Sequence, residues 1–153
     1  MSTYIQPAEK VQLLKLTERL KSLSKLASLT AIGIGCLVLG GWIFDITILK
    51  SVLPGLVTMK ANTALGIIGS GLSLWLWHFS RRETRVTLTH LFSIGAQVLA
   101  IVVTLLGLVS LIQYGFQVDF GIDQILFKDS IDAVDAAARG RMAPNTATNF
   151  LLL

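Results

Sequence analysis

Residues 91–114 read LFSIGAQVLAIVVTLLGLVSLIQY, a run that contains no Asp, Glu, Lys or Arg. The hydrocarbon core of a bilayer is about 30 Å thick, so a helix that rises about 1.5 Å per residue needs about 20 apolar residues to cross it. This run meets that length. It therefore predicts a membrane-spanning helix, and it sets the scale for the other apolar stretches of the chain.

Two earlier stretches, residues 26–44 and 61–79, also lack charged side chains and are bounded by charge. The whole chain is 53% hydrophobic and 14% charged, with a mean hydropathy of +0.70, whereas soluble domains are about 25% charged. The predicted fold class is therefore all-α and integral to a membrane. The stretch 26–44 could also be the apolar core of a signal peptide. Its long basic leader, and the lack of an Ala-x-Ala-like site after it, favour an uncleaved anchor.

Residues 144–153, PNTATNFLLL, begin a fourth apolar stretch that stops in mid-helix. At about 1.5 Å per residue it is too short to cross a bilayer. We therefore expect a polytopic helical bundle with a truncated fourth span, so that the chain is a fragment of a longer protein.

Basic side chains concentrate on one predicted side of the membrane. Residues 1–25 and the link 80–90 hold eight of the thirteen Lys and Arg residues, whereas the other two links hold six of the nine acids. Because basic residues accumulate in cytoplasmic segments, the N-terminus is expected in the cytoplasm. The net charge of +4 then reflects topology, and we expect no nucleic-acid partner despite the general link between basic charge and such binding.

Residues 1–25 are predicted to form a cytoplasmic, basic, amphipathic helix. Apolar residues recur there at near-helical spacing among Lys, Arg and Glu: Val11, Leu13, Leu14, Leu16, Leu20 and Leu23. Such a helix can lie along an anionic membrane surface, which is the favoured role. A partner helix in a dimer is the main alternative.

An internal repeat organises the rest of the chain. The string Met59-Lys-Ala-Asn62-Thr63-Ala64 opens the second span, and Met142-Ala-Pro-Asn145-Thr146-Ala147 opens the fourth. Each string follows a helix and an outer loop, which predicts a duplicated hairpin. The first unit is 26–79, with spans 26–44 and 61–79. The second is 91–153, with span 91–114, outer loop 115–143 and the start of the fourth span at 144–153.

The Asn-Thr pairs of the repeat have a simple physical role. A helix that enters lipid leaves its first amide groups unpaired, and Asn or Thr side chains can accept hydrogen bonds from them. We therefore predict that the repeat motifs form helix caps. The residues concerned are Met59, Asn62, Thr63, Met142, Asn145 and Thr146. Binding of an outside ligand by the two loops is the alternative.

Small residues line one side of each of the last two complete spans. Gly66, Ser70 and Ser73 mark this side in 61–79, and Gln97, Ala100 and Thr104 mark it in 91–114. Small residues let membrane helices approach closely. Gln97 is expected to face protein and form an interhelical hydrogen bond, because an unpaired amide is costly in hydrocarbon. A role in binding a ligand or conducting protons is the alternative.

The sequence shows no catalytic or metal-ligand motif, and we expect neither a catalytic residue nor a cofactor in this chain. His78 and His90 flank the 80–90 link and are expected at the cytoplasmic ends of adjacent helices. Facing imidazoles in a bundle can ligate haem, so this pair is the candidate for a haem or metal site. The alternative is interfacial anchoring beside Trp75 and Trp77.

Beyond about residue 30 the chain resembles the multi-span N-terminal input regions of bacterial, often cyanobacterial, sensor histidine kinases and related PAS-domain signalling proteins. The matching strings are Gly41-Trp-Ile-Phe-Asp45, Val52-Leu-Pro-Gly-Leu-Val-Thr-Met-Lys-Ala-Asn-Thr-Ala64, Gly121-Ile-Asp-Gln-Ile-Leu-Phe127 and Arg141-Met-Ala-Pro-Asn-Thr-Ala147. The resemblance implies the bacterial inner membrane and a following PAS, histidine kinase or diguanylate cyclase module. No phosphoacceptor His or ATP-binding motif maps onto this chain.

The sequence therefore predicts a sensory or anchoring region of a signal-transduction protein, forming a homodimer in the lipid bilayer and acting on cytoplasmic signalling modules. A membrane transporter subunit is one alternative, since repeats are common in transporters. Transport would require ionisable residues inside the spans, and none is present apart from the terminal His78 and His90. A haem- or quinone-binding membrane protein is the other alternative.

Overall fold

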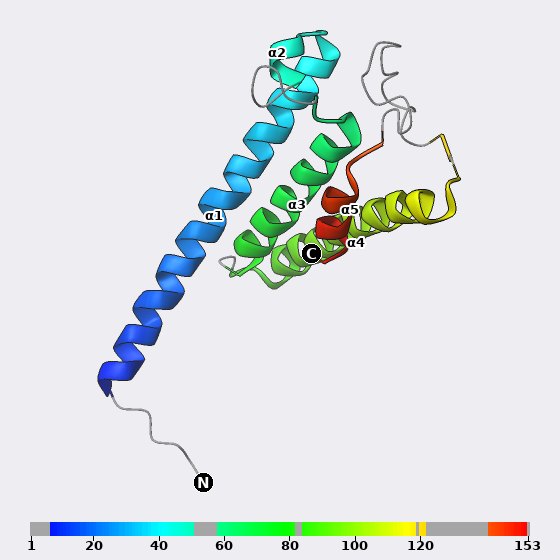
Figure 1. The fold of residues 1–153 in the computed structure, drawn as a ribbon. Helices are drawn as coiled ribbons and strands as arrows, with labels where there is room; N and C mark the ends of the chain where they lie inside the picture. Colours follow the sequence, from blue (N-terminus) through cyan, green and yellow to red (C-terminus); the bar gives the residue numbers. More distant parts are fainter. Residues whose placement is uncertain (1–6, 51–57, 82–83, 119, 122–140, 153) are drawn as a thin grey trace.

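The computed structural model describes residues 7–50, 58–81, 84–118, 120–121 and 141–152. This part of the chain contains helices and no strands, which confirms the predicted all-helical class. The helices are α1 (Pro7–Ile43), α2 (Thr47–Lys50), α3 (Ala61–Ser80), α4 (Val86–Phe116) and α5 (Pro144–Leu151) (Figure 1). Most of the predicted outer loop 115–143 lies outside the described residues.

Two of the described helices are long and apolar enough to cross a membrane: α1, over Glu9–Ile43, and α4, over Val86–Phe116. The helix α3 coincides with the predicted span 61–79 but is not one of the two. Asn62 and Thr63 in its first turn and His78 in its last lower its mean hydropathy. Length and composition are therefore compatible with a helical membrane protein.

The helix α1 is continuous through residue 25, where the sequence analysis separated an amphipathic helix from a first span. No Pro or Gly occurs between Pro7 and Gly33, so nothing local breaks the helix there. Its 37 residues correspond to a length of about 55 Å. The N-terminal half projects beyond the other helices along the axis of the apolar half (Figure 1).

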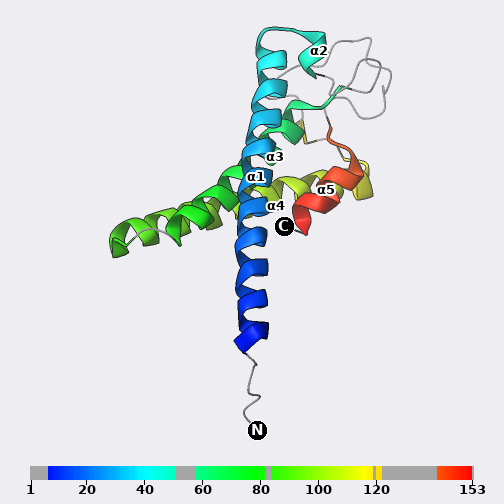
Figure 2. The ribbon, with the colours of Figure 1, turned by 90° about the vertical axis from the view of Figure 1, so that its left-hand side faces the viewer.

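The helix α3 is the centre of the bundle. It packs against α1 on one side and α4 on another, and α5 packs against α4. Figure 2 shows α1 in front, with α3 and α4 crossing behind it, so that α4 is steeply inclined to α1. The short helix α2 folds back beside the end of α1.

Glycines set the close approach of α3 to its neighbours. A Cβ placed on Gly35 of α1 would lie 2.9 Å from the carbonyl oxygen of Ala64 and 2.5 Å from Ile68 Cγ1. A Cβ on Gly71 of α3 would lie 2.9 Å from the carbonyl oxygen of Ser28. The two backbones can therefore approach this closely only because these side chains are absent.

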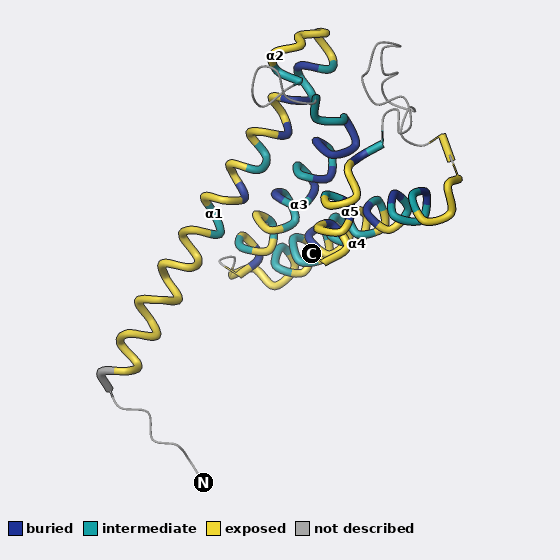
Figure 3. The backbone as a smooth tube through the Cα atoms, viewed as in Figure 1, coloured by how far each residue is buried: buried dark blue, intermediate teal, exposed yellow. Residues whose placement is uncertain are grey.

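The buried core lies where α4 and α5 meet. Val103, Met142, Ala147 and Phe150 form one apolar cluster, and Met142 and Ala147 are fully buried. A Cβ on Gly107 of α4 would lie 2.6 Å from the carbonyl oxygen of Ala147. Figure 3 shows the buried residues on the facing sides of α3, α4 and α5, whereas the N-terminal half of α1 is exposed.

Replacing Gly35 with Val should destabilise the bundle, because the new side chain would collide with Ala64 and Ile68 of α3. Overpacking of this kind costs about 1–3 kcal/mol. Gly33→Val is the matched control, since nothing lies within 4 Å of a Cβ there. Thermal unfolding in detergent, followed by circular dichroism, should show a clear fall in Tm for Gly35→Val only. Equal Tm values for the two variants would contradict the close contact of α1 with α3.

Candidate functional site

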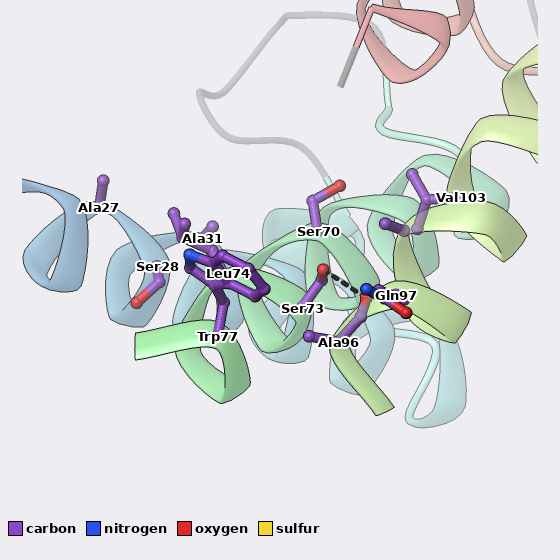
Figure 4. A pocket seen from close by; sticks show the side chains of 12 residues that line it. Ala27, Ser28, Ala31, Ser70, Ser73, Leu74, Trp77, Ala96, Gln97 and Val103 are labelled. Carbon is purple, nitrogen blue, oxygen red and sulfur yellow. Dashed lines mark hydrogen bonds between the residues drawn. The ribbon is translucent and has the colours of Figure 1, made fainter. Parts of the chain in front are cut away.

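A cleft of about 460 Å³ opens between α1, α3 and α4 (Figure 4). It exists because α1 and α4 pack on different sides of α3 and leave part of α3 uncovered between them. Its lining is mostly apolar, and it includes four of the six predicted packing residues. The lining residues are Ala27, Ser28, Ala31, Ser70, Gly71, Ser73, Leu74, Trp77, Ala96, Gln97, Ala100 and Val103.

Two serines of α3 in the cleft satisfy their hydroxyl groups on backbone carbonyls. Ser73 Oγ donates to the carbonyl oxygen of Ala96 on α4 at 2.7 Å, the contact drawn as a dashed line in Figure 4. Ser70 Oγ donates to the carbonyl oxygen of Gly66 within α3 at 2.8 Å. Ser73 therefore joins α3 to α4 through a side-chain hydrogen bond.

Gln97 does not form the interhelical hydrogen bond predicted for it. It is exposed at the edge of the cleft, and among the described residues its amide has no hydrogen-bond partner. The hydrogen bond between α3 and α4 at this point comes instead from Ser73, which donates to the backbone carbonyl of Ala96, the residue before Gln97.

The other predicted packing residues have different neighbours. Gly66 is buried, and its α-carbon faces the ring of Phe150 on α5 rather than α4. Ala100 lines the cleft, and Thr104 is half-buried on α4. The small residues of α3 thus serve three different contacts instead of one continuous interface.

An aromatic side chain at the end of each long helix donates a hydrogen bond to the methionine of the following repeat motif. Trp42 Nε1 donates to the carbonyl oxygen of Met59 at 2.9 Å, and Lys50 Nζ lies 4.7 Å from the centre of the Trp42 ring. We call this set of contacts the Trp42 clasp. It ties the end of α1 to the start of α3.

The second repeat contains the same arrangement, here called the Tyr114 clasp. Tyr114 OH donates to the carbonyl oxygen of Met142 at 3.0 Å, and the Arg141 guanidinium lies 5.2 Å from the centre of the Tyr114 ring. A cation above an aromatic face is attracted by the ring quadrupole. Each clasp therefore combines one hydrogen bond and one cation–π contact, and the Tyr114 clasp ties α4 to the start of α5.

The likeness of the two repeats extends into the long helices. Gly35 lies seven residues before Trp42 and faces the carbonyl of Ala64, while Gly107 lies seven residues before Tyr114 and faces the carbonyl of Ala147. This pattern was not predicted from the sequence. The seven-residue spacing from glycine to aromatic was visible, but its partners in the repeat motifs are distant along the chain.

The predicted caps lie inside their helices. The N-cap residues are Lys60 and Ala143, both in extended conformation and neither with a side-chain capping bond. Pro144 occupies the first turn of α5, and its fixed φ favours a helix start at that point. Asn62 and Thr63 are buried in the first turn of α3, Asn145 is exposed and Thr146 is half-buried. Both helices therefore begin where the sequence predicted, but the Asn and Thr residues lie in the first turn instead of at the cap position.

The two histidines do not form a facing pair. His78 Nε2 lies 2.8 Å from Ser24 Oγ on α1, within hydrogen-bond distance, whereas His90 is exposed on α4. Within the described residues no group of three or more His, Cys, Asp or Glu side chains is placed to hold a metal ion. His78 therefore connects α3 with α1 instead of facing His90.

Asp45 and Lys50 form an ion pair beside the Trp42 clasp. The hydrogen bond from Lys50, and next its positive charge, hold the pKa of Asp45 below its ordinary value of 3.8. The stabilisation from this ion pair is therefore fully present above pH 3.8, and it is lost as the pH falls through the lowered pKa of Asp45.

Removing the donor of a clasp should loosen the first turn of the following helix. Tyr114→Phe keeps the ring beneath Arg141 but leaves the Met142 carbonyl without its donor. Losing this hydrogen bond should lower the local stability of the first turn of α5 by about 1 kcal/mol. That change corresponds to roughly fivefold faster amide exchange at the start of α5, measured by hydrogen–deuterium exchange and mass spectrometry. Trp42→Phe should do the same at the start of α3.

Trp75→Phe is the control for both clasp variants, because Trp75 stacks on Phe79 and takes no part in either clasp. It should leave exchange at the starts of α3 and α5 unchanged. Unaltered exchange in Tyr114→Phe and Trp42→Phe would show that the clasps do not hold these helix ends.

The comparisons with known proteins supply no relative on which to base the function of this site. No protein-family model matches the chain, and neither a curated protein nor a solved structure is significantly similar to it.

Proposed function

We propose that this chain is the membrane-embedded input and anchoring region of a bacterial signal-transduction protein. In this proposal it lies in the inner membrane, with its N-terminus in the cytoplasm. The observation that carries the proposal is α1, a single helix whose C-terminal end is held by the Trp42 clasp and whose N-terminal half extends past the bundle. Such a helix can carry a displacement from the clasp to the opposite end of the molecule.

The surfaces of α1 and α4 support a location in lipid. Only 22% of the most apolar window of each helix is buried, whereas the core helix of a soluble protein would be mostly covered. Large apolar side chains such as Leu29, Leu37, Ile101 and Leu105 are more than half exposed. A bilayer provides the apolar surroundings that these side chains lack within the chain.

The length of α4 suits a tilted membrane span. Its 31 residues correspond to about 46 Å, whereas the hydrocarbon core is about 30 Å thick. A span longer than the bilayer core is accommodated by tilting. An α4 that is inclined to the membrane normal can therefore still cross the bilayer.

The clasps support the interpretation as two tandem hairpins, α1 with α3 and α4 with α5. In each pair a glycine faces the alanine carbonyl of the repeat motif, and an aromatic donor seven residues later reaches the methionine carbonyl. The same contacts at both repeats are what duplication of one two-span unit would produce. In this proposal α5 begins a further span.

Signalling would proceed by a change in helix packing. The cleft leaves room beside α3 into which a neighbouring helix can move. A stimulus at the clasps or within the membrane would favour one of two packing arrangements. The resemblance to sensor kinases supports a homodimer that controls PAS, histidine kinase or diguanylate cyclase modules of the full-length protein.

The proposal predicts that a change at the Trp42 clasp is felt at the far end of α1. Spin labels at Lys21 and Thr84, in a Cys36→Ser background and diluted with unlabelled protein, report the distance from α1 to the α3–α4 turn. Trp42→Phe removes the hydrogen bond to Met59 and should shift the mean distance, measured by double electron–electron resonance in nanodiscs, by at least about 2 Å, the upper end of typical helix shifts.

Trp75→Phe is again the control and should leave that distance unchanged. If Trp42→Phe also leaves it unchanged while the protein stays in the membrane, α1 does not transmit the state of the clasp. The chain would then be a passive anchor.

A further inference from the structure

The cleft between α1, α3 and α4 has basic side chains at one end. On α3, Trp77 lines the cleft, and the Arg81 guanidinium lies 4.5 Å from the centre of its ring. On α1, Ser28 lines the cleft, and its hydroxyl donates to the carbonyl oxygen of Lys25 at 2.8 Å. Residues three apart share one face of a helix, so Lys25 lies on the face of Ser28. Both walls of the cleft therefore lead to a cation.

A contact between α1 and α3 places these two cations at the same level. His78 Nε2 lies 2.8 Å from Ser24 Oγ. Lys25 directly follows Ser24 in α1, and Trp77 directly precedes His78 in α3. Because the Arg81 guanidinium lies on the Trp77 ring, Lys25 and Arg81 border the same end of the cleft. We call this end the basic mouth.

The charges of the basic mouth are not neutralised within the described chain. Neither Lys25 nor Arg81 forms an ion pair with a described residue. The helices α3 and α4 contain no acidic side chain, and the last acid of α1 is Glu18, which pairs with Lys21 at 2.9 Å. The basic mouth is therefore complementary to a negatively charged group.

The rest of the cleft is apolar and open at its edge. Ala31 of α1 and Ala100 and Val103 of α4 line it away from the basic mouth, and Figure 4 shows Val103 and Trp77 toward opposite ends. The volume of about 460 Å³ lies in the range of about 300–1,000 Å³ found for small-molecule sites. Leu74 and Trp77 are exposed at the edge, so a hydrocarbon chain can enter from a surrounding bilayer.

Gln97 stands between the basic mouth and the apolar part of the cleft. Ser73 donates to the carbonyl oxygen of Ala96, the residue before Gln97, and Trp77 follows Ser73 by one helical turn, about 6 Å. The Gln97 amide has no hydrogen-bond partner among the described residues. In a phospholipid the ester carbonyls lie next to the phosphate, on the side of the acyl chains. Gln97 is thus placed to donate to such a carbonyl.

We propose that the cleft is a specific binding site for one anionic phospholipid of the cytoplasmic leaflet. The lipid phosphate lies between Lys25 and Arg81, an ester carbonyl accepts a hydrogen bond from the Gln97 amide, and one acyl chain fills the apolar part. Basic pockets between spans on the cytoplasmic side bind anionic headgroups in this way. A neutral lipid would leave the two cations unmatched. The inference rests on the membrane location in the proposed function.

Thermal unfolding of the purified chain in a neutral detergent tests the site. A ligand that binds only the folded chain raises Tm by an amount that depends on its concentration and Kd. Each basic side chain strengthens the attraction of an anionic lipid by about fivefold. Phosphatidylglycerol should therefore bind at least about tenfold more tightly than phosphatidylcholine with the same acyl chains. Glycerol phosphate, which lacks the chains, should leave Tm unchanged at the same concentration.

Paired charge variants test the basic mouth. The double variant Lys25→Gln, Arg81→Gln should lower the preference for phosphatidylglycerol to less than about threefold. The double variant Lys15→Gln, Arg19→Gln removes the same charge from exposed positions in the projecting half of α1 and should keep the preference. An equal effect of the two double variants would overturn the site, because the protein's overall charge would then be enough to explain the binding.

Paired apolar variants test the cleft itself. Ala100→Phe should fill the space of the acyl chain and weaken binding of phosphatidylglycerol by at least about tenfold, since each buried CH₂ is worth roughly fourfold. Val102→Phe is the control, because Val102 is exposed on the same helix and does not line the cleft. Unchanged binding to a folded Ala100→Phe chain would overturn the site. The charge variants decide the question if that chain does not fold.

The remaining outcomes separate this inference from the proposed function. Equal Tm shifts with the two phospholipids, or a shift with glycerol phosphate as large as that with phosphatidylglycerol, would overturn the lipid site alone. The chain would still be recovered from membranes only with detergent, as the proposed function requires. Release of the chain without detergent would overturn both proposals.

Discussion

The close packing of α3 against its neighbours is the constraint on which the rest of the structure depends. Gly35 and Gly71 bring the backbones of α1 and α3 together, Gly69 receives Val103 of α4, and Gly66 receives the ring of Phe150. In the lipid environment that we propose for the bundle there is no hydrophobic drive between helices, so association would depend on such van der Waals contact and on interhelical hydrogen bonds. The Ser73 hydroxyl on the Ala96 carbonyl supplies one of these bonds between α3 and α4.

The cleft and the clasps both follow from this arrangement. Because α1 and α4 occupy different sides of one central helix, part of α3 stays uncovered, and Gln97 stands at the edge of that space without a described partner. The clasps then fix where α3 and α5 begin, by pairing a backbone carbonyl of each repeat motif with an aromatic donor from the preceding helix. Packing thus positions the middle of the bundle, and the clasps position one end.

Local sequence patterns were enough to find the helices but not their contacts. The apolar runs placed α3 and α4 closely, with α4 starting at Val86 inside the expected link. They also divided α1 at residue 25, where the density of charged residues falls. No Pro or Gly occurs there, so the helix continues through that point. The repeat motif was recognised from its letters, whereas its contacts with Trp42 and Tyr114 span 17 and 28 residues. Only the fold shows that Met59 and Met142 serve as backbone acceptors, and that His78 lies beside Ser24 instead of His90.

The proposed bundle crosses a membrane with α2 on one side and the α3–α4 turn on the other. Single cysteines at Ile48 and Thr84, both exposed, can be labelled in a Cys36→Ser background with a thiol reagent that does not cross membranes. This topology predicts labelling of Ile48→Cys in intact cells, and labelling of Thr84→Cys only after the membrane is permeabilised. Equal labelling of the two positions in intact cells, or a protein that is released without detergent, would contradict it.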